Sequence, residues 1–112
     1  MEIIIKTKNL ELTEALELVV TKKIGVLKKF LAGASATMVV ELERDNKHRH
    51  KGDVFLVELI MTAPGRKSVA KHHSDDLLAS LAQAKKEMEL ELTKYKDKKI
   101  GERREARKSR KE

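Results

Sequence analysis

The sequence predicts an α+β domain in which a four-stranded sheet carries two helices on one face. The chain has 112 residues, about the size of one domain, and its 38% charged and 40% hydrophobic residues are typical of a globular protein. Its periodic segments follow the order β-α-β-β-β-α, and each helical segment carries one apolar stripe. Both stripes have to be buried on the same sheet face, which leaves the other face to water or to a partner.

The first strand is expected at residues 1–7 and the first helix directly after it. Ile3 and Ile5 share one face of a segment that is rich in β-branched residues. Thr13 is a suitable N-cap, and Gly33 ends the helix after residue 31. The apolar stripe of this helix consists of Leu16, Val19, Val20, Ile24, Leu27, Phe30 and Leu31.

Three further strands are expected at residues 37–43, 54–61 and 67–72. The first alternates apolar and polar residues, the second is apolar at nearly every position, and the third is short, with Val69 directed inward. Pro64 and Gly65 form the turn before the last strand. The crossover through the first helix makes the first two strands parallel, and the others form an antiparallel meander.

The second helix is expected to begin at an N-cap provided by Ser74, with Asp75 and Asp76 in its first turn. Its composition favours helix to about Lys99. Residues 100–112 have no apolar periodicity, so we expect a folded domain of residues 1–99 and a basic, disordered tail. The apolar stripe consists of Leu77, Leu78, Leu81, Ala84, Met88, Leu92 and Tyr95.

Composition excludes several classes of function. The absence of cysteine excludes disulfides, thiolate catalysis and cysteine-based zinc sites, and two Phe, one Tyr and no Trp are too few for a base-stacking platform. No apolar run is long enough to cross a membrane, and no signal or transit peptide is recognisable. We therefore expect a cytoplasmic protein, or a stromal one if the source is a plastid, without membrane or small-molecule partners.

The net charge of +7 is concentrated at the C-terminal end. Residues 94–112 hold ten Lys or Arg and four Asp or Glu, a net of +6. Such a segment attracts a polyanion. An anionic membrane would also require an apolar face, but Ile100 and Ala106 are the only aliphatic residues after Lys99, so nucleic acid is the better partner.

No catalytic or metal-binding constellation is recognisable. His48 and His50 could offer two metal ligands, but they lie in a basic loop without a third ligand at a diagnostic spacing. His73, Ser74 and Asp75 are consecutive and cannot adopt triad geometry. We therefore expect neither an enzyme nor a cofactor.

Basic side chains suggest an RNA-binding surface. On a helical wheel, Lys22 and Lys29 lie opposite the first apolar stripe, Lys28 lies on its flank, and Lys23 has to extend past it. These lysines could also be solvated without any function. A second basic set makes phosphates of folded RNA the better explanation, and it consists of Arg44, Lys47, Arg49, Lys51, Arg66, Lys86, Lys94 and Lys96.

In their order and spacing, several segments resemble the ribosome hibernation-promoting factors and ribosome-associated inhibitors of bacteria and plastids, in their short form. The resemblance covers Ile3 to about Asp97. It depends on residues 8–16, Lys22-Lys23-Ile24, Leu27-Lys28-Lys29-Phe30, His50-Lys51, Pro64-Gly65-Arg66, Ser74-Asp75-Asp76-Leu77 and Leu92-Thr93-Lys94-Tyr95-Lys96.

The resemblance implies a fold similar to the double-stranded-RNA-binding domain and a steric mechanism without catalysis. Proteins of this family bind the small ribosomal subunit in the channel of mRNA and tRNA, hold rRNA backbone with basic residues of both helices, and block translation during stress. The chain would be a monomer when free. The rRNA-binding residues would be Lys22, Lys23, Lys28, Lys29, Arg44, Arg49, Lys51, Arg66, Lys86, Lys94 and Lys96.

The middle of the second helix departs from the family pattern. Relatives tend to have Lys or Arg at the positions of Glu87, Leu90 and Thr93, and Leu90 lies opposite the apolar stripe, where it should be exposed. The alternative to a ribosome-bound inhibitor is therefore a general RNA-binding or RNA-chaperone module. The sequence does not distinguish promotion of ribosome dimers from retention of inactive monomers.

Overall fold

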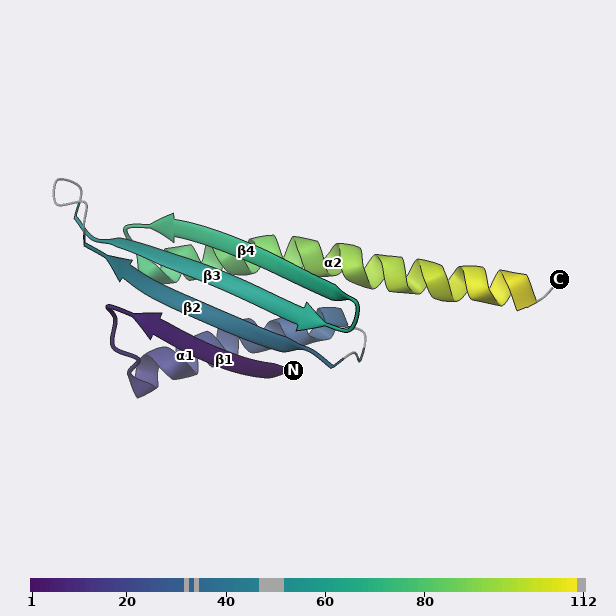
Figure 1. Cartoon of the computed structure of the whole chain (residues 1–112), viewed down its shortest axis with the longest axis horizontal. Coiled ribbons are helices and arrows are strands. Elements are labelled where there is room, and N and C mark those ends of the chain that lie inside the picture. The colour runs from purple at the N-terminus through teal and green to yellow at the C-terminus, as the bar shows by residue number, and fades with distance from the viewer. Residues whose placement is uncertain (32, 34, 47–51, 111–112) are drawn as a thin grey trace.

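In the computed structural model, a four-stranded sheet carries both helices on one face (Figure 1). The structure describes residues 1–31, 33, 35–46 and 52–110, with side chains as far as residue 94. The predicted α+β fold and β-α-β-β-β-α order are confirmed. The elements are β1 (Glu2–Lys8), α1 (Glu14–Gly25), the 3-10 helix η1 (Val26–Leu31), β2 (Thr37–Asp45), β3 (Val54–Ala63), β4 (Arg66–Ser74) and α2 (Leu77–Arg110).

The strands lie in the order β1-β2-β3-β4, which follows the chain. β1 pairs in parallel with β2, and the other two pairs are antiparallel, as predicted. Pro64 and Gly65 connect β3 to β4. Gly65 has a φ of 74°, which a residue with a side chain rarely adopts, and Pro followed by such a Gly is typical of a type II turn.

The core lies between the sheet and the helices. Met38, Val40 and Leu42 of β2 are fully buried, and Ile3 and Ile5 of β1 pack against them, so the predicted alternation of both strands is confirmed. The remaining fully buried large side chains come from both helices, η1 and β3, and they are Val20, Ile24, Leu27, Leu31, Val57, Leu59, Met61, Leu81, Met88 and Leu92.

The predicted inward direction of Val69 is wrong. Val69 lies on the outer face of the sheet and is 50% exposed, whereas Ser68 and Ala70 point inward and are buried. α2 packs extensively on β4. Small side chains at the inward positions of this strand allow the helix to approach closely, and the larger Val69 occupies the opposite face.

The first helix also differs from the prediction, because it does not stay α-helical to residue 31. α1 ends at Gly25, and Val26–Leu31 form the 3-10 helix η1. Glycine stabilises an α-helix less than other residues, and the tighter 3-10 turn advances about 120° per residue instead of about 100°. Lys28 and Lys29 are therefore rotated away from the directions that an α-helical wheel assigns to them.

Ser74 is not the N-cap of the second helix. Asp76 has this role, since its Oδ1 accepts hydrogen bonds from the backbone N–H of Leu78 at 2.9 Å and of Ala79 at 3.4 Å. The Ser74 hydroxyl donates to the carbonyl of Asp76 at 2.8 Å and lies 2.7 Å from the Ser80 hydroxyl. Both aspartates therefore precede α2, which begins at Leu77.

The helical backbone of α2 continues to Arg110, past the predicted end near Lys99 and through most of the segment expected to be disordered. This segment is rich in Lys, Arg, Glu and Ala, which are good helix formers even without an apolar face. Figure 1 shows that α2 projects beyond the sheet, and the molecule is 66 Å long. The division into a domain of residues 1–99 and a tail remains a prediction.

Candidate nucleic-acid interface

The end of α1 and the following η1 present four exposed lysines. Lys22 and Lys23 lie in the last turn of α1, where positive charge is favoured by the helix dipole, and Lys28 and Lys29 lie on η1. The Lys29 Nζ lies 5.2 Å from the centroid of the Phe30 ring, a cation–π contact. Within the described part of the chain, none of the four forms an ion pair.

α2 adds an exposed row in which residues follow each other at intervals of four. Lys86, Leu90 and Lys94 form this row, and Leu90 is 60% exposed, as predicted. Lys86 has no ion-pair partner among the described residues, whereas the Lys94 Nζ lies 3.6 Å from Glu91 Oε1. η1 packs against α2, so this row and the lysines of η1 belong to the same helix layer.

Two acidic side chains of α2 lie close to nitrogen atoms of neighbouring side chains. The Glu87 Oε2 lies 3.3 Å from the Nε2 of His72 on β4, and the Glu89 Oε1 lies 3.8 Å from the Lys85 Nζ. These side chains are still partly exposed, so the middle of α2 presents mixed charge. Its basic character therefore depends on Lys86 and Lys94.

Two of the predicted phosphate-binding arginines are paired with carboxylates of the same chain. The Arg44 Nη2 lies 2.8 Å from the Asp53 Oδ2, and its Nε donates to the same oxygen at 3.0 Å. The Arg66 Nε donates to the Ser68 hydroxyl at 3.2 Å, and its Nη2 lies 3.4 Å from the Glu91 Oε2. Sequence reasoning missed both carboxylate partners, because neither Asp53 nor Glu91 has a spacing that indicates the pairing.

The other predicted site residues lie beyond the described part. Lys47, His48, Arg49, His50 and Lys51 are outside the described residues, as is the side chain of Lys96. The predicted basic residues that are exposed on described helices are Lys22, Lys23, Lys28, Lys29, Lys86 and Lys94, which we call the helix-layer lysines.

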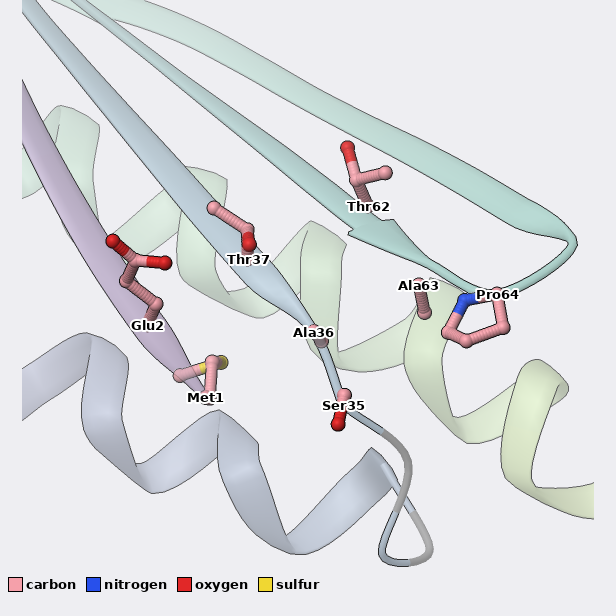
Figure 2. Close-up of a pocket in the computed structure, with 8 residues that line it drawn as sticks. All are labelled: Met1, Glu2, Ser35, Ala36, Thr37, Thr62, Ala63 and Pro64. Carbon is pink, nitrogen blue, oxygen red and sulfur yellow. The ribbon is translucent and has the colours of Figure 1, made fainter.

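A shallow pocket lies at one end of the sheet, and none of these lysines lines it. It has a volume of about 550 Å³ and lies where β1 and β2 begin and β3 ends (Figure 2). Of its lining side chains only Glu2 is charged, so the pocket contains no acid–base pair and no nucleophile with an adjacent base. Its residues are Met1, Glu2, Ser35, Ala36, Thr37, Thr62, Ala63 and Pro64.

Neither a metal site nor a membrane span is found in the described part of the chain. No three of its His, Asp and Glu side chains are grouped to hold a metal ion. None of its helices is both apolar and long enough to cross a bilayer.

An α+β fold with two helices on one face of the sheet and exposed lysines on that helix layer defines a class of small proteins suited to contact with a polyanion. A sequence profile of the family described as sigma 54 modulation protein / S30EA ribosomal protein matches residues 3–100. The chain belongs to this family. The predicted family is thereby confirmed, and the family is not one of enzymes.

Two solved structures share the fold. The N-terminal domain of Protein Y from Thermus thermophilus superposes with a TM-score of 0.74 at 23% identity, covering 85% of this chain and 99% of that one. A ribosomal subunit interface protein from Coxiella burnetii has a TM-score of 0.72 at 22% identity, covering 87% of this chain and 99% of that one. No curated protein sequence matches significantly.

Proposed function

We propose that this protein binds the small ribosomal subunit through its helix layer and blocks translation sterically. The observation that carries the proposal is the group of exposed lysines on α1, η1 and α2 that have no ion-pair partner within the described part of the chain, which belongs to this family. A lysine without a protein carboxylate can bind a phosphate without first breaking an ion pair, and folded rRNA presents phosphates spaced along its backbone.

The family and the solved relatives support the ribosome as the partner. The family description includes a ribosomal protein, and the Coxiella relative is described as a ribosomal subunit interface protein. We propose the channel of mRNA and tRNA as the site, stress as the occasion and the cytoplasm as the location, in line with the family resemblance. A protein in that channel would inhibit by occupying space, and no catalytic step is required.

Sedimentation through a sucrose gradient tests the proposal. Purified protein is mixed with 30S subunits, 70S ribosomes or an equal mass of protein-free structured RNA at the same salt concentration. Comigration with 30S subunits and 70S ribosomes, together with inhibition of translation in vitro, is expected. Equal binding to the free RNA without inhibition would instead support the general RNA-binding module.

Two charge-reversal variants locate the surface. Lys22→Glu/Lys29→Glu changes the helix layer, and Lys6→Glu/Lys67→Glu changes the opposite face of the sheet by the same charge, from +7 to +3. All four side chains are exposed, so neither variant should unfold. We expect the first to lose ribosome binding and the second to keep it. Equal losses would mean that only net charge matters, and would contradict the helix layer as the binding surface.

A further inference from the structure

The face of the sheet opposite the helices carries an apolar row that crosses all four strands. Ile4 pairs with Val39, Val39 with Ile60, and Ile60 with Val69, so the four side chains stand side by side. Ile4 is 38% and Val69 50% exposed, and the two central residues are half-buried. No described element covers this row, since both helices lie on the other face (Figure 1).

Polar rows flank the apolar row on both sides. One row is Glu2, Thr37, Thr62 and Lys67, and the other is Lys6, Glu41, Glu58 and Lys71. The two rows hold three acidic and three basic residues, so together they are neutral in a chain of net charge +7. Its acidic residues Glu41 and Glu58 occupy the two central strands and repel phosphate. The face therefore suits a protein partner and not RNA.

We propose that this face binds a second copy of the chain, sheet against sheet, about a two-fold axis that follows the apolar row. Under this symmetry each apolar residue meets its own equivalent, and each flanking row lies over the other flanking row of the partner. Glu2 then faces the partner's Lys6. The hydroxyls of Thr37 and Thr62 can donate to the partner's Glu41 and Glu58.

Charge selects this arrangement over the alternative two-fold axis. An axis parallel to the strands would place Glu2 over Lys67, which is favourable, but also Glu41 over Glu58 and Lys6 over Lys71, so that repulsive contacts would outnumber attractive ones by two to one. The selected axis leaves one kind of unfavourable contact, Lys67 over Lys71, which occurs as often as the favourable contact of Glu2 with Lys6. The unfavourable contact is weakened because the Lys71 Nζ already lies 3.8 Å from the Glu58 Oε2. The strands of the two sheets run antiparallel, within the usual range for aligned sheet packing.

The size of the patch implies weak association. Four strands about 4.8 Å apart and three rows about 6.7 Å apart give a projected area of about 400 Å². Stable interfaces bury about 800 Å² on each partner. The chain should therefore be monomeric at micromolar concentration and self-associate as the concentration approaches the millimolar range. The helix layer stays free in the dimer, so the inference is independent of the proposed function.

A charge swap within one strand tests the geometry. Glu2 and Lys6 are four residues apart on β1, about 13 Å, and cannot pair within one chain. Analytical ultracentrifugation of the full chain measures self-association from micromolar to millimolar concentration. Because the contact of Glu2 with the partner's Lys6 occurs twice in the dimer, Glu2→Lys should weaken self-association about fivefold. The combined Glu2→Lys/Lys6→Glu variant, which has the wild-type net charge, should restore it to within about twofold of wild type.

Two controls keep the test decisive. Glu11→Lys changes the net charge as Glu2→Lys does, but it lies in the exposed loop before α1 and should have a smaller effect. Val69→Lys introduces a charge at an exposed position of the apolar row and should abolish self-association while circular dichroism shows a folded protein. A wild-type protein that stays monomeric at millimolar concentration, or a charge swap that does not restore association, would overturn the proposal.

Discussion

Arg66, at the start of β4, joins the sheet to Glu91 on α2 by two contacts of one nitrogen. Its Nη2 lies 3.3 Å from the backbone carbonyl of Glu91 and 3.4 Å from the Oε2 of the same residue. The Nε of Arg66 donates to Ser68. The contact ties the turn between β3 and β4 to the turn of α2 that contains the buried Leu92. α2 continues from there and projects beyond the sheet (Figure 1).

We expect Arg66→Ala to lower the free energy of unfolding by about 1–2 kcal/mol, because hydrogen bonds from a charged donor are lost at a side chain that is only 25% exposed. Urea denaturation measures this change. Lys22→Ala, at an exposed position, should change stability by less than about 0.5 kcal/mol. A double-mutant cycle with Glu91→Ala should give a coupling energy of about 0.5–1 kcal/mol, and strict additivity would show that the contact does not stabilise the fold.

The two aspartates before α2 should differ in their contribution to stability. Asp76→Ala removes the oxygen that accepts two backbone N–H groups of the helix, and should cost about 1 kcal/mol. Asp75→Ala removes an exposed carboxylate that has no such hydrogen bond, and should be nearly neutral. Thermal denaturation of the two variants measures how much each substitution lowers the melting temperature. A larger effect of Asp75→Ala would contradict Asp76 as the N-cap.

The helix-layer lysines should determine how binding to ribosomes depends on salt. Each phosphate contact contributes about 0.9 to the slope of the logarithm of affinity against the logarithm of salt concentration. Lys22→Ala/Lys29→Ala should flatten this slope by about two units in equilibrium binding to 30S subunits, with little change in melting temperature. If the slope stays the same while affinity falls, these lysines act otherwise than by phosphate contact.

Leu90 offers a test by gain of function. It is 60% exposed between Lys86 and Lys94, so Leu90→Lys completes a basic row without disturbing the core. If this row contacts phosphate, the variant should bind 30S subunits more tightly, with a slope steeper by about one unit. Val69→Lys is the matched control, because Val69 is 50% exposed and lies on the sheet face opposite the helix layer. Equal gains from both variants would indicate a general charge effect.

Sequence periodicity was sufficient for the fold class because β1, β2 and β3 have apolar residues at their buried inward positions and each helical segment has one apolar stripe. β4 shows the limit of such reasoning. Its one large apolar residue, Val69, suggests an inward position, but the strand is close to α2, and the inward positions hold Ser68 and Ala70. Which residues of β4 point inward depends on how closely α2 packs on this strand. Because α2 follows β4 in the chain, the local periodicity of β4 does not predict this packing.

The candidate site was predictable only in part, because contacts between segments far apart in the sequence decide which basic side chains are paired. The exposure of Lys22 and Lys29 follows from helical periodicity, even though η1 changes their relative direction. The ion pairs of Arg44 with Asp53 and of Arg66 with Glu91 depend on the strand register and on the packing of α2 on the sheet. A count of basic residues therefore overestimates the cations that are available to a ligand.

The last prediction concerns the segment after Lys99. The last residue of α2 known to be buried in the core is Leu92, so a chain that ends at Lys99 should unfold cooperatively with a small change in melting temperature. The removed segment holds six basic and three acidic residues, a net of +3. Its loss should weaken binding to 30S subunits at moderate salt and flatten the salt dependence, because fewer counterions are released.

A full-length variant separates the effect of the segment's charge from that of its helical structure. The full-length chain with Arg103, Arg104 and Arg107 replaced by Gln keeps good helix formers but changes the net charge of residues 100–112 from +3 to zero. If this variant binds as weakly as the truncated chain, the segment acts through its charge. If the truncated chain keeps the affinity and salt slope of the full chain, the segment has no part in binding. A truncated chain that fails to fold would show that the domain extends beyond residue 99.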